Sequence, residues 1–278
     1  MHLLMIVVVL IVAWWLRTSW NPSSGDWVQR WQRSLFYFLF PPLLVLTTVL
    51  AVLCMGTRGT MGGMNAGSFG YLLALTALIL VNVQGLRLAW QGWQSIKSAR
   101  ECPQINLDGQ TVRLLPTPAL FAGQMGFWQP ELVVSQGLIE SLSPAHLDSV
   151  LAHEQGHHHY RDTFWFFWLG WVRSCTAWLP QTEALWQELL MLRELRADSY
   201  AADRVDPLTL AESLLLVVSS KPVISGVCCA ALGNNSDRLE QRIEALINPT
   251  APINTTQLQS WHLFLLAFLP LITVIFHT

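Results

Sequence analysis

The chain has 278 residues, enough for one large domain or for a smaller domain joined to membrane helices. Charged residues make up only 12% of it, hydrophobic residues make up 52%, and the mean hydropathy is +0.38. A soluble domain carries about twice that charged share, so the composition favours a protein that places much of its surface in lipid. The net charge of -2 and the lack of a basic stripe argue against direct nucleic-acid binding.

The chain contains five cysteines, and no two of them form a CxxC pair. An odd number without paired spacing does not suit a disulfide framework or a cysteine-based zinc knuckle. We expect these thiols to be free and to lie in the core or in lipid.

Four apolar segments are candidate membrane helices: residues 3–16, 35–55, 71–90 and 261–276. The first and last are shorter than the usual span of about 20 residues. Tryptophans stand near the ends of the segments, as in an aromatic belt. The first segment lacks a basic flank and a small-residue cleavage pattern, so we expect an uncleaved anchor rather than a signal peptide.

Basic residues predict the orientation of these segments. The connection over residues 17–33 carries three arginines, whereas that over 56–70 carries one, and Lys97 and Arg100 follow the third segment. Because cytoplasmic connections are enriched in Lys and Arg, the first connection and the chain from about residue 95 onward are predicted to be cytoplasmic. We therefore expect a multi-pass protein of the plasma or inner membrane, with the N-terminus outside.

The middle of the chain reads as a globular domain. Residues 111–115 and 132–135 look like short strands, separated by glycines and prolines. Ser143 and Pro144 suit the N-cap and first position of a helix. Further helices are predicted over residues 182–203 and 238–247.

The predicted helix after Pro144 carries the sequence His153-Glu154-Gln155-Gly156-His157, an HExxH motif. Two histidines four residues apart stand on one face of a helix, so both imidazoles can bind one ion. Glu154, beside the first histidine, can take a proton from an attacking water. We predict that His153 and His157 bind zinc and that Glu154 is the catalytic base. A solvated helix face with incidental histidines is the alternative.

A catalytic zinc needs a third protein ligand and one open position. Glu194 and Asp198 lie four residues apart on a predicted helix, where Glu194 could bind the metal and Asp198 could accept the free N–H of a ligating histidine. Glu188 and Glu183 are competing third ligands, and Glu194 could also be a surface residue beside two arginines.

Other residues near the motif are given structural roles. His158 and His159 are expected to face solvent or to support the site, and Asp162 to stabilise the local backbone. The apolar segment 163–178 cannot be a simple membrane crossing, because His157 and Glu194 would then lie on opposite sides of the bilayer. We expect it to be buried, half-inserted or interfacial, which would place the site close to the membrane surface.

These motifs, in this order, resemble the BlaR/MecR-type membrane metallopeptidases and, more distantly, the HtpX and CaaX-protease type. The segment LVVSQGL over residues 132–138, HEQGH, Asp162 and the Glu194–Asp198 pair carry the resemblance. It implies a gluzincin with His153, His157 and Glu194 as zinc ligands and Glu154 as base. The penicillin-binding sensor of BlaR/MecR would begin near Thr278, so we expect no antibiotic sensing by that route.

We therefore expect a mainly α, multi-pass membrane protein with a zincin-like α+β metallopeptidase domain, made of an HExxH helix, an ExxxD helix and a small sheet. The predicted domains are a membrane region with three helices (1–95), the metallopeptidase domain (96–255) and a C-terminal membrane helix (256–278).

The expected function is a zinc-dependent endopeptidase acting on membrane-associated or cytoplasmic proteins, with a BlaI-like repressor as a substrate suggested by analogy alone. A non-catalytic membrane scaffold or sensor with a structural or vestigial metal site is the alternative. A fourth protein ligand on the metal would favour the scaffold.

Overall fold

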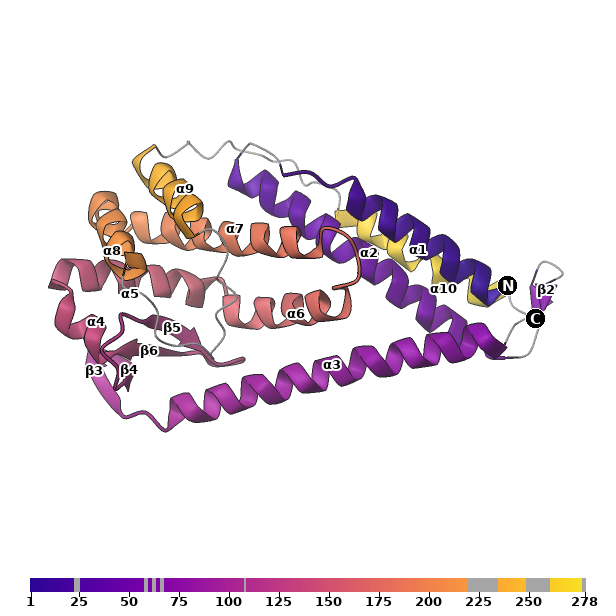
Figure 1. Cartoon of the computed structure of the whole chain (residues 1–278), viewed down its shortest axis with the longest axis horizontal. Coiled ribbons are helices and arrows are strands. Elements are labelled where there is room, and N and C mark those ends of the chain that lie inside the picture. Colours follow the sequence, from indigo (N-terminus) through magenta and orange to yellow (C-terminus); the bar gives the residue numbers. More distant parts are fainter. Residues whose placement is uncertain are drawn as a thin grey trace. The chain divides into compact units, whose positions relative to one another are not determined.

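The computed structural model describes residues 1–22, 26–57, 60–61, 64–65, 68–107, 109–219, 235–248 and 261–276. Most of these residues are helical (Figure 1). The chain divides into two compact units. Unit 1 comprises Met1–Leu88, Gly170–Leu189 and Pro252–Thr278, and unit 2 comprises Ala89–Leu169 and Leu190–Ala251.

Unit 1 is built from apolar helices. Its long elements are α1 (His2–Thr18), α2 (Trp27–Met55) and the first two thirds of α3 (Ser68–Arg100). A short hairpin of β1 (Thr60–Met61) and β2 (Met64–Asn65) precedes α3. The C-terminal helical segment consists of η1 (Trp261–Phe268), α10 (Leu269–Ile272) and η2 (Thr273–Phe276).

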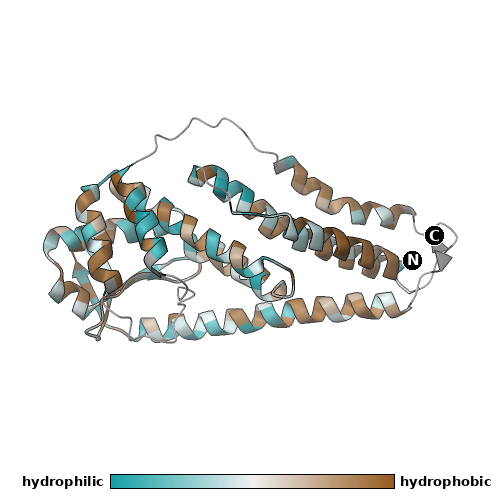
Figure 2. Ribbon diagram, turned by 45° about the horizontal axis from the view of Figure 1, so that its top comes forward, coloured by the Kyte–Doolittle hydropathy of each residue, from teal (hydrophilic) through white to brown (hydrophobic). Residues whose placement is uncertain are grey.

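The core of unit 1 forms where α1 and the C-terminal segment pack against α2. One cluster joins Val52 and Met55 of α2 to Ala74 of α3, and another joins Phe40 of α2 to Ala267 of the C-terminal segment. Figure 2 shows apolar residues along much of these helices. Unit 1 is therefore held together mainly by apolar packing between helices.

Two helices of unit 1, α2 and α3, are long and apolar enough to cross a membrane by length and composition. Within the apolar window of α2, 56% of residues are buried inside the protein, whereas the figure for α3 is 11%. A buried core helix can also pass such a test, so α3 is the stronger candidate. The other two segments predicted to span, α1 and the C-terminal one, form shorter apolar helices.

Two of the arginines used to predict orientation have partners inside unit 1. Arg17 is fully buried, and its guanidinium donates to the carbonyl oxygen of Phe38 at 3.1 Å. Arg30 forms a salt bridge with Glu188 at 2.8 Å. These side chains stabilise the fold, and the orientation of the chain remains a prediction.

Unit 2 contains a four-stranded mixed sheet in the order β3-β4-β6-β5. The strands are β3 (Gln104–Leu107), β4 (Gln110–Leu115), β5 (Ala122–Met125) and β6 (Glu131–Ser135). The two strands predicted from sequence, β4 and β6, are the parallel central pair. The outer strands β3 and β5 were missed, because the alternation of Ile105 and Leu107 in β3 covers only four residues and β5 contains glycine and glutamine.

The helices that follow the sheet carry the HExxH and ExxxD motifs of the sequence. They are α4 (Gln136–Ser141), α5 (Pro144–His159), α6 (Asp162–Cys175), α7 (Thr182–Ala202), α8 (Pro207–Ser219) and α9 (Asn235–Ile247). The predicted start of α5 is confirmed, since the Ser143 hydroxyl accepts from the His146 N–H and Pro144 is the first helical residue. The predicted helix over 182–203 is confirmed as α7.

The core of unit 2 lies on both sides of α5. Leu147, Val150 and Leu151 of α5 pack with Val134 of β6 and Leu138 of α4. Another cluster, on the side of α8 and α9, is made of Ala152, Ala201, Leu210, Ala211, Leu214 and Leu246. The helix that carries the HExxH motif is thus fixed by apolar contacts before any metal is considered.

Small residues let α5 and α7 approach each other closely at the motif. A Cβ added to Gly156 would lie 3.1 Å from both the Cα and the carbonyl oxygen of Ala197. Ala197 itself is fully buried. Because Gly156 stands inside HEQGH and Ala197 inside ELRAD, this approach brings the two motifs face to face.

Candidate metal centre

The structure brings together the three side chains predicted to bind metal. His153 and His157 of α5 point their Nε2 atoms at each other across 3.1 Å. Glu194 of α7 places Oε2 3.4 Å from His153 Nε2 and Oε1 3.8 Å from His157 Nε2. Among the residues that the structure describes, these three form a group that could hold a metal ion.

The spacing of these atoms suits a tetrahedral ion. Bonds of about 2.0–2.2 Å to N and O ligands separate neighbouring tetrahedral ligand atoms by roughly 3.3–3.6 Å. The observed separations of 3.1, 3.4 and 3.8 Å bracket that range. Two imidazole nitrogens and one carboxylate oxygen are also donors that zinc accepts.

Each histidine has a carboxylate on its other ring nitrogen. His153 Nδ1 lies 2.8 Å from Asp198 Oδ1, and His157 Nδ1 lies 2.7 Å from Asp162 Oδ2. A carboxylate at Nδ1 holds the proton there and leaves the Nε2 lone pair free for a metal. Both histidines are thus oriented so that their Nε2 atoms face the same point.

Three arginines surround the group and neutralise its carboxylates. Arg242 of α9 donates from Nε and Nη2 to both oxygens of Asp198, at 2.7 and 2.8 Å, and its Nη1 lies 3.3 Å from Glu194 Oε2. Arg193 donates to Glu194 Oε1 at 2.7 Å. Arg196 forms an ion pair with Asp162 and lies over the ring of Tyr160.

These charges decide the protonation of the buried groups. Burial lowers the pKa of His153, but the negative charges of Asp198 and Glu194 outweigh it and raise this pKa to about 9. Burial raises the pKa of Glu194, yet the charges of Arg193 and of the two histidines hold this pKa well below its usual value. Burial likewise opposes ionisation of Asp198, and Arg242 keeps its pKa low. The site therefore attracts positive charge at Nε2.

Glu154 lies beside this group without belonging to it. It follows His153 on α5 and is 7% exposed. Against burial, Glu194 raises the pKa of Arg193 and Asp198 raises the pKa of Arg242, and the charge of Glu154 adds to both. Glu154 therefore places its carboxyl group near the same arginines as the metal group. Its carbonyl oxygen accepts from the Gln124 side chain of β5 at 3.3 Å. A base near the metal group and close to a strand edge fits hydrolysis of an extended chain.

The two glutamates considered as alternative third ligands have other partners. Glu188 is paired with Arg30, and Glu183 is paired with Arg173 at 2.8 Å. His158 and His159 are exposed, as predicted, and His159 stacks on Tyr200 with ring centroids 4.9 Å apart. The described cysteines, Cys54, Cys102 and Cys175, are free.

Asp162, expected to stabilise the local backbone, is the first residue of α6 and also contacts His157. Its carboxylate contacts His157 and Arg196 and is 3% exposed. Sequence reasoning also missed Arg242 and Arg196. Asp162 offered a local signal, because it follows His157 by only five residues. In the structure the chain turns between them at Arg161, whose φ is 54°. Arg242 offered none, since it lies on a separate helix.

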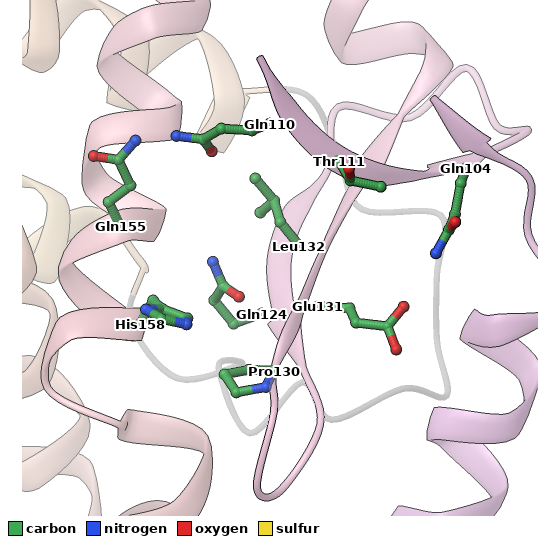
Figure 3. A pocket seen from close by; sticks show the side chains of 9 residues that line it. All are labelled: Gln104, Gln110, Thr111, Gln124, Pro130, Glu131, Leu132, Gln155 and His158. Atoms are coloured by element: carbon green, nitrogen blue, oxygen red, sulfur yellow. The ribbon is translucent and has the colours of Figure 1, made fainter. Parts of the chain in front are cut away.

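A pocket of about 480 Å³ lies on the sheet side of α5 (Figure 3). Its wall is rich in amides from Gln104, Gln110, Gln124 and Gln155, and His158 also lines it. The carboxylate of Glu131 in this wall is paired with Arg113 at 2.7 Å. The pocket therefore offers hydrogen bonds from neutral groups next to the helix that carries Glu154.

Comparison with known families supports a metallopeptidase. A family profile described as Peptidase family M48 matches residues 104–191. The matched segment runs through the sheet and the HEQGH helix and ends before Glu194. No curated protein and no solved structure matched the chain. The match does not decide between a BlaR/MecR and an HtpX/CaaX-protease subtype.

Proposed function

We propose that this protein is a membrane-anchored zinc endopeptidase with His153, His157 and Glu194 as metal ligands. One observation carries the proposal: two imidazole Nε2 atoms lie 3.1 Å apart, each imidazole has a carboxylate at Nδ1, and a third carboxylate faces both. Two imidazole nitrogens and a carboxylate oxygen aimed at one point are a donor set that zinc accepts. The family match supports the peptidase class.

Zinc is proposed because its usual ligands match this donor set. When bound, zinc would polarise the scissile carbonyl and make an attacking water more acidic. Glu154 is proposed to accept the proton of that water and to pass it to the leaving amine. Asp198 and Asp162 would keep the two imidazoles in the tautomer and orientation that binding needs.

An extended substrate is proposed to pair with β5. The strand over residues 131–135, β6, lies between β4 and β5 and has no open edge for such pairing. β5 is one of the two edge strands, and the Gln124 side chain of β5 donates to the carbonyl oxygen of Glu154. A peptide added at this edge would run beside the base, with backbone hydrogen bonds giving affinity. The amide-lined pocket would favour neutral polar side chains over charged ones.

Membrane anchoring rests on α3 and α2, and a cytoplasmic site rests on the arginine count of the sequence. Proteins at or in the same membrane are therefore the proposed substrates. Cleavage of a BlaI-like repressor remains a narrower suggestion by analogy. The domain boundaries at residues 95 and 255 likewise remain predictions.

The alternative of a non-catalytic scaffold or sensor calls for a metal filled by four protein ligands. Within the described ranges the metal group has three, which leaves a position for water or substrate. A retained Glu154 also favours catalysis.

The test uses the full chain in detergent and in vesicles, with a proteome-derived peptide library as substrate. We expect about one zinc per chain and cleavage that stops with a chelator and returns with zinc. Cleavage that survives complete removal of the metal would contradict the proposal, and so would a metal-loaded protein that cuts no peptide in the library.

A further inference from the structure

Six aromatic side chains of unit 2 meet on its surface and are called the aromatic patch below. Two come from the loop between β5 and β6 and four from the first half of α6: Phe127, Trp128, Phe164, Trp165, Phe167 and Trp168. Phe127 joins the two parts, with ring centroids 4.9 Å from Phe164 and 5.0 Å from Phe167. Three tryptophans remain open, since Trp128 is 79%, Trp165 56% and Trp168 41% exposed.

The loop that presents Trp128 has a defined shape. Gly126 adopts a φ of 135°, and a Cβ there would lie 2.7 Å from the carbonyl oxygen of Gln129. Only glycine fits this turn without strain. Trp128 also packs on Phe164, with centroids 5.4 Å apart. The tryptophan is therefore held outward by a tight turn and a packed neighbour.

The six residues of the patch are uncharged, and the exposed Arg161 stands directly before α6. α6 contains two charged residues, Asp162 and Arg173. Asp162 is buried behind His157, and Arg173 is paired with Glu183 at the other end of the helix. An exposed uncharged surface of this kind indicates a contact with something apolar or amphipathic.

The course of α6 indicates what that contact is. Just beyond the patch, the Trp171 indole N–H donates to the carbonyl oxygen of Val81 in α3 at 2.9 Å. Val81 lies inside the apolar stretch of α3, the helix best suited to cross a bilayer. The four patch residues of α6 precede Trp171 by three to seven residues, about 5 to 10 Å along the helix axis at 1.5 Å per residue. Tryptophan is enriched where a membrane protein passes from hydrocarbon to headgroups.

We propose that the aromatic patch lies in the membrane–water interface and that the lipid bilayer is its partner. The inference rests on the membrane anchoring in the proposed function and adds which surface of the peptidase unit touches lipid. Asp162, the first residue of α6, also orients His157. The metal group is therefore linked to the start of the helix that carries most of the patch. The peptide bonds that the protein cuts should lie close to the point where a substrate leaves the bilayer.

The test measures the depth of single sites in the full chain reconstituted in phosphatidylcholine vesicles. The five native cysteines are replaced by serine, and a spin label is attached to Trp128→Cys or Trp165→Cys. Collision with oxygen reports lipid, and collision with chromium oxalate reports water. Leu208→Cys on α8, 61% exposed, is the matched control for an exposed apolar residue outside the patch, and Leu80→Cys on α3, 59% exposed, marks the span.

Labels at 128 and 165 are expected to favour oxygen, as at 80, whereas the label at 208 favours chromium oxalate. Labels at 128 and 165 that match the one at 208 would overturn the proposal. Spin–spin broadening at 128 would also overturn it, in favour of a second copy of the chain. A label at 80 that reads water would refute the anchoring itself, whatever the peptidase activity.

A second measurement keeps the native cysteines, so that misfolding of the cysteine-free chain cannot decide the result. Brominated lipids should quench less of the intrinsic fluorescence in Trp128→Phe/Trp165→Phe than in the unchanged chain. An equal quenched fraction in both would contradict a lipid contact at these tryptophans.

Discussion

The two histidines of the metal group differ in where the carboxylate at Nδ1 comes from. Asp162 reaches His157 from five residues along the chain, across the turn that joins α5 to α6. Asp198 reaches His153 from α7 and is itself held by Arg242 of α9. The support of His157 is local, whereas that of His153 requires three helices to be docked. The docking of α9 should therefore affect the metal group through Asp198 and His153 and through Glu194, which Arg242 also contacts, but not through Asp162.

The largest expected effect comes from removing the carboxylate that faces both histidines. Glu194 faces both Nε2 atoms, so Glu194→Ala should remove most of the bound metal and all detectable proteolysis. Metal is measured by elemental analysis of the purified protein. Glu188→Ala, one of the competing ligands and paired with Arg30, is the control and should keep its metal. The reverse result would move the ligand back along α7.

The next effect compares the two carboxylates that support the histidines. Asp198→Ala and Asp162→Ala should each weaken zinc binding by about 10- to 100-fold, the usual consequence of losing a carboxylate behind a ligating histidine. Competition with a chelating dye gives the two dissociation constants. If Asp162→Ala binds zinc normally, its contact with His157 serves only the helix start.

Arg242 tests the support that Asp198 gives to His153, and it also pairs with Glu194. Its side chain is 12% exposed, and removing one partner of a buried ion pair costs about 3–5 kcal/mol. Arg242→Ala should lower the free energy of unfolding by about that amount and weaken metal binding, and Arg242→Lys should do so less. Arg100→Ala, whose side chain is 60% exposed beside Glu131, should cost about 1 kcal/mol or less. Equal losses of stability in the two alanine variants, measured by thermal denaturation, would argue against a stabilising role for the Arg242–Asp198 pair.

The smallest effect concerns the close approach of α5 and α7, which brings the two histidines to Glu194 and Asp198. Gly156→Ala places a methyl group 3.1 Å from the backbone of Ala197, so the helices must separate slightly. We expect a loss of about 1–3 kcal/mol in stability and a modest loss of zinc affinity. Gly170→Ala in α6, whose nearest neighbour would be Trp186 at 3.9 Å, is the control and should be neutral or stabilising. Unchanged stability of Gly156→Ala would show that the helices have room.

The sequence predicted those parts of the site that depend on local spacing. His153, Glu154 and His157 stand on one helix, and the four-residue spacing of Glu194 and Asp198 put both on one face of another. The α5 start at Ser143 and Pro144 was likewise encoded by neighbouring residues. The outer strands β3 and β5 were not, because a strand of four residues is defined by its partners rather than by its own pattern.

Residues brought in by tertiary packing could not be predicted. Arg242 belongs to an amphipathic helix, and nothing within that helix distinguishes an arginine that clamps Asp198 from one that faces water. Arg17 illustrates the same limit in unit 1, because it was counted among the arginines of a predicted cytoplasmic connection and is fully buried. In both cases the burial of the charge is decided by segments distant in the sequence.

The most direct test of the proposed mechanism is the metal content and proteolytic rate of Glu154→Gln. The substitution keeps the shape of the side chain and removes the base, and Glu154 is not among the proposed ligands. Zinc should remain at about one per chain, while cleavage of a library-derived peptide falls by about 100-fold or more. A Glu154→Gln protein that holds its zinc and cleaves at the unchanged rate would contradict the peptidase mechanism.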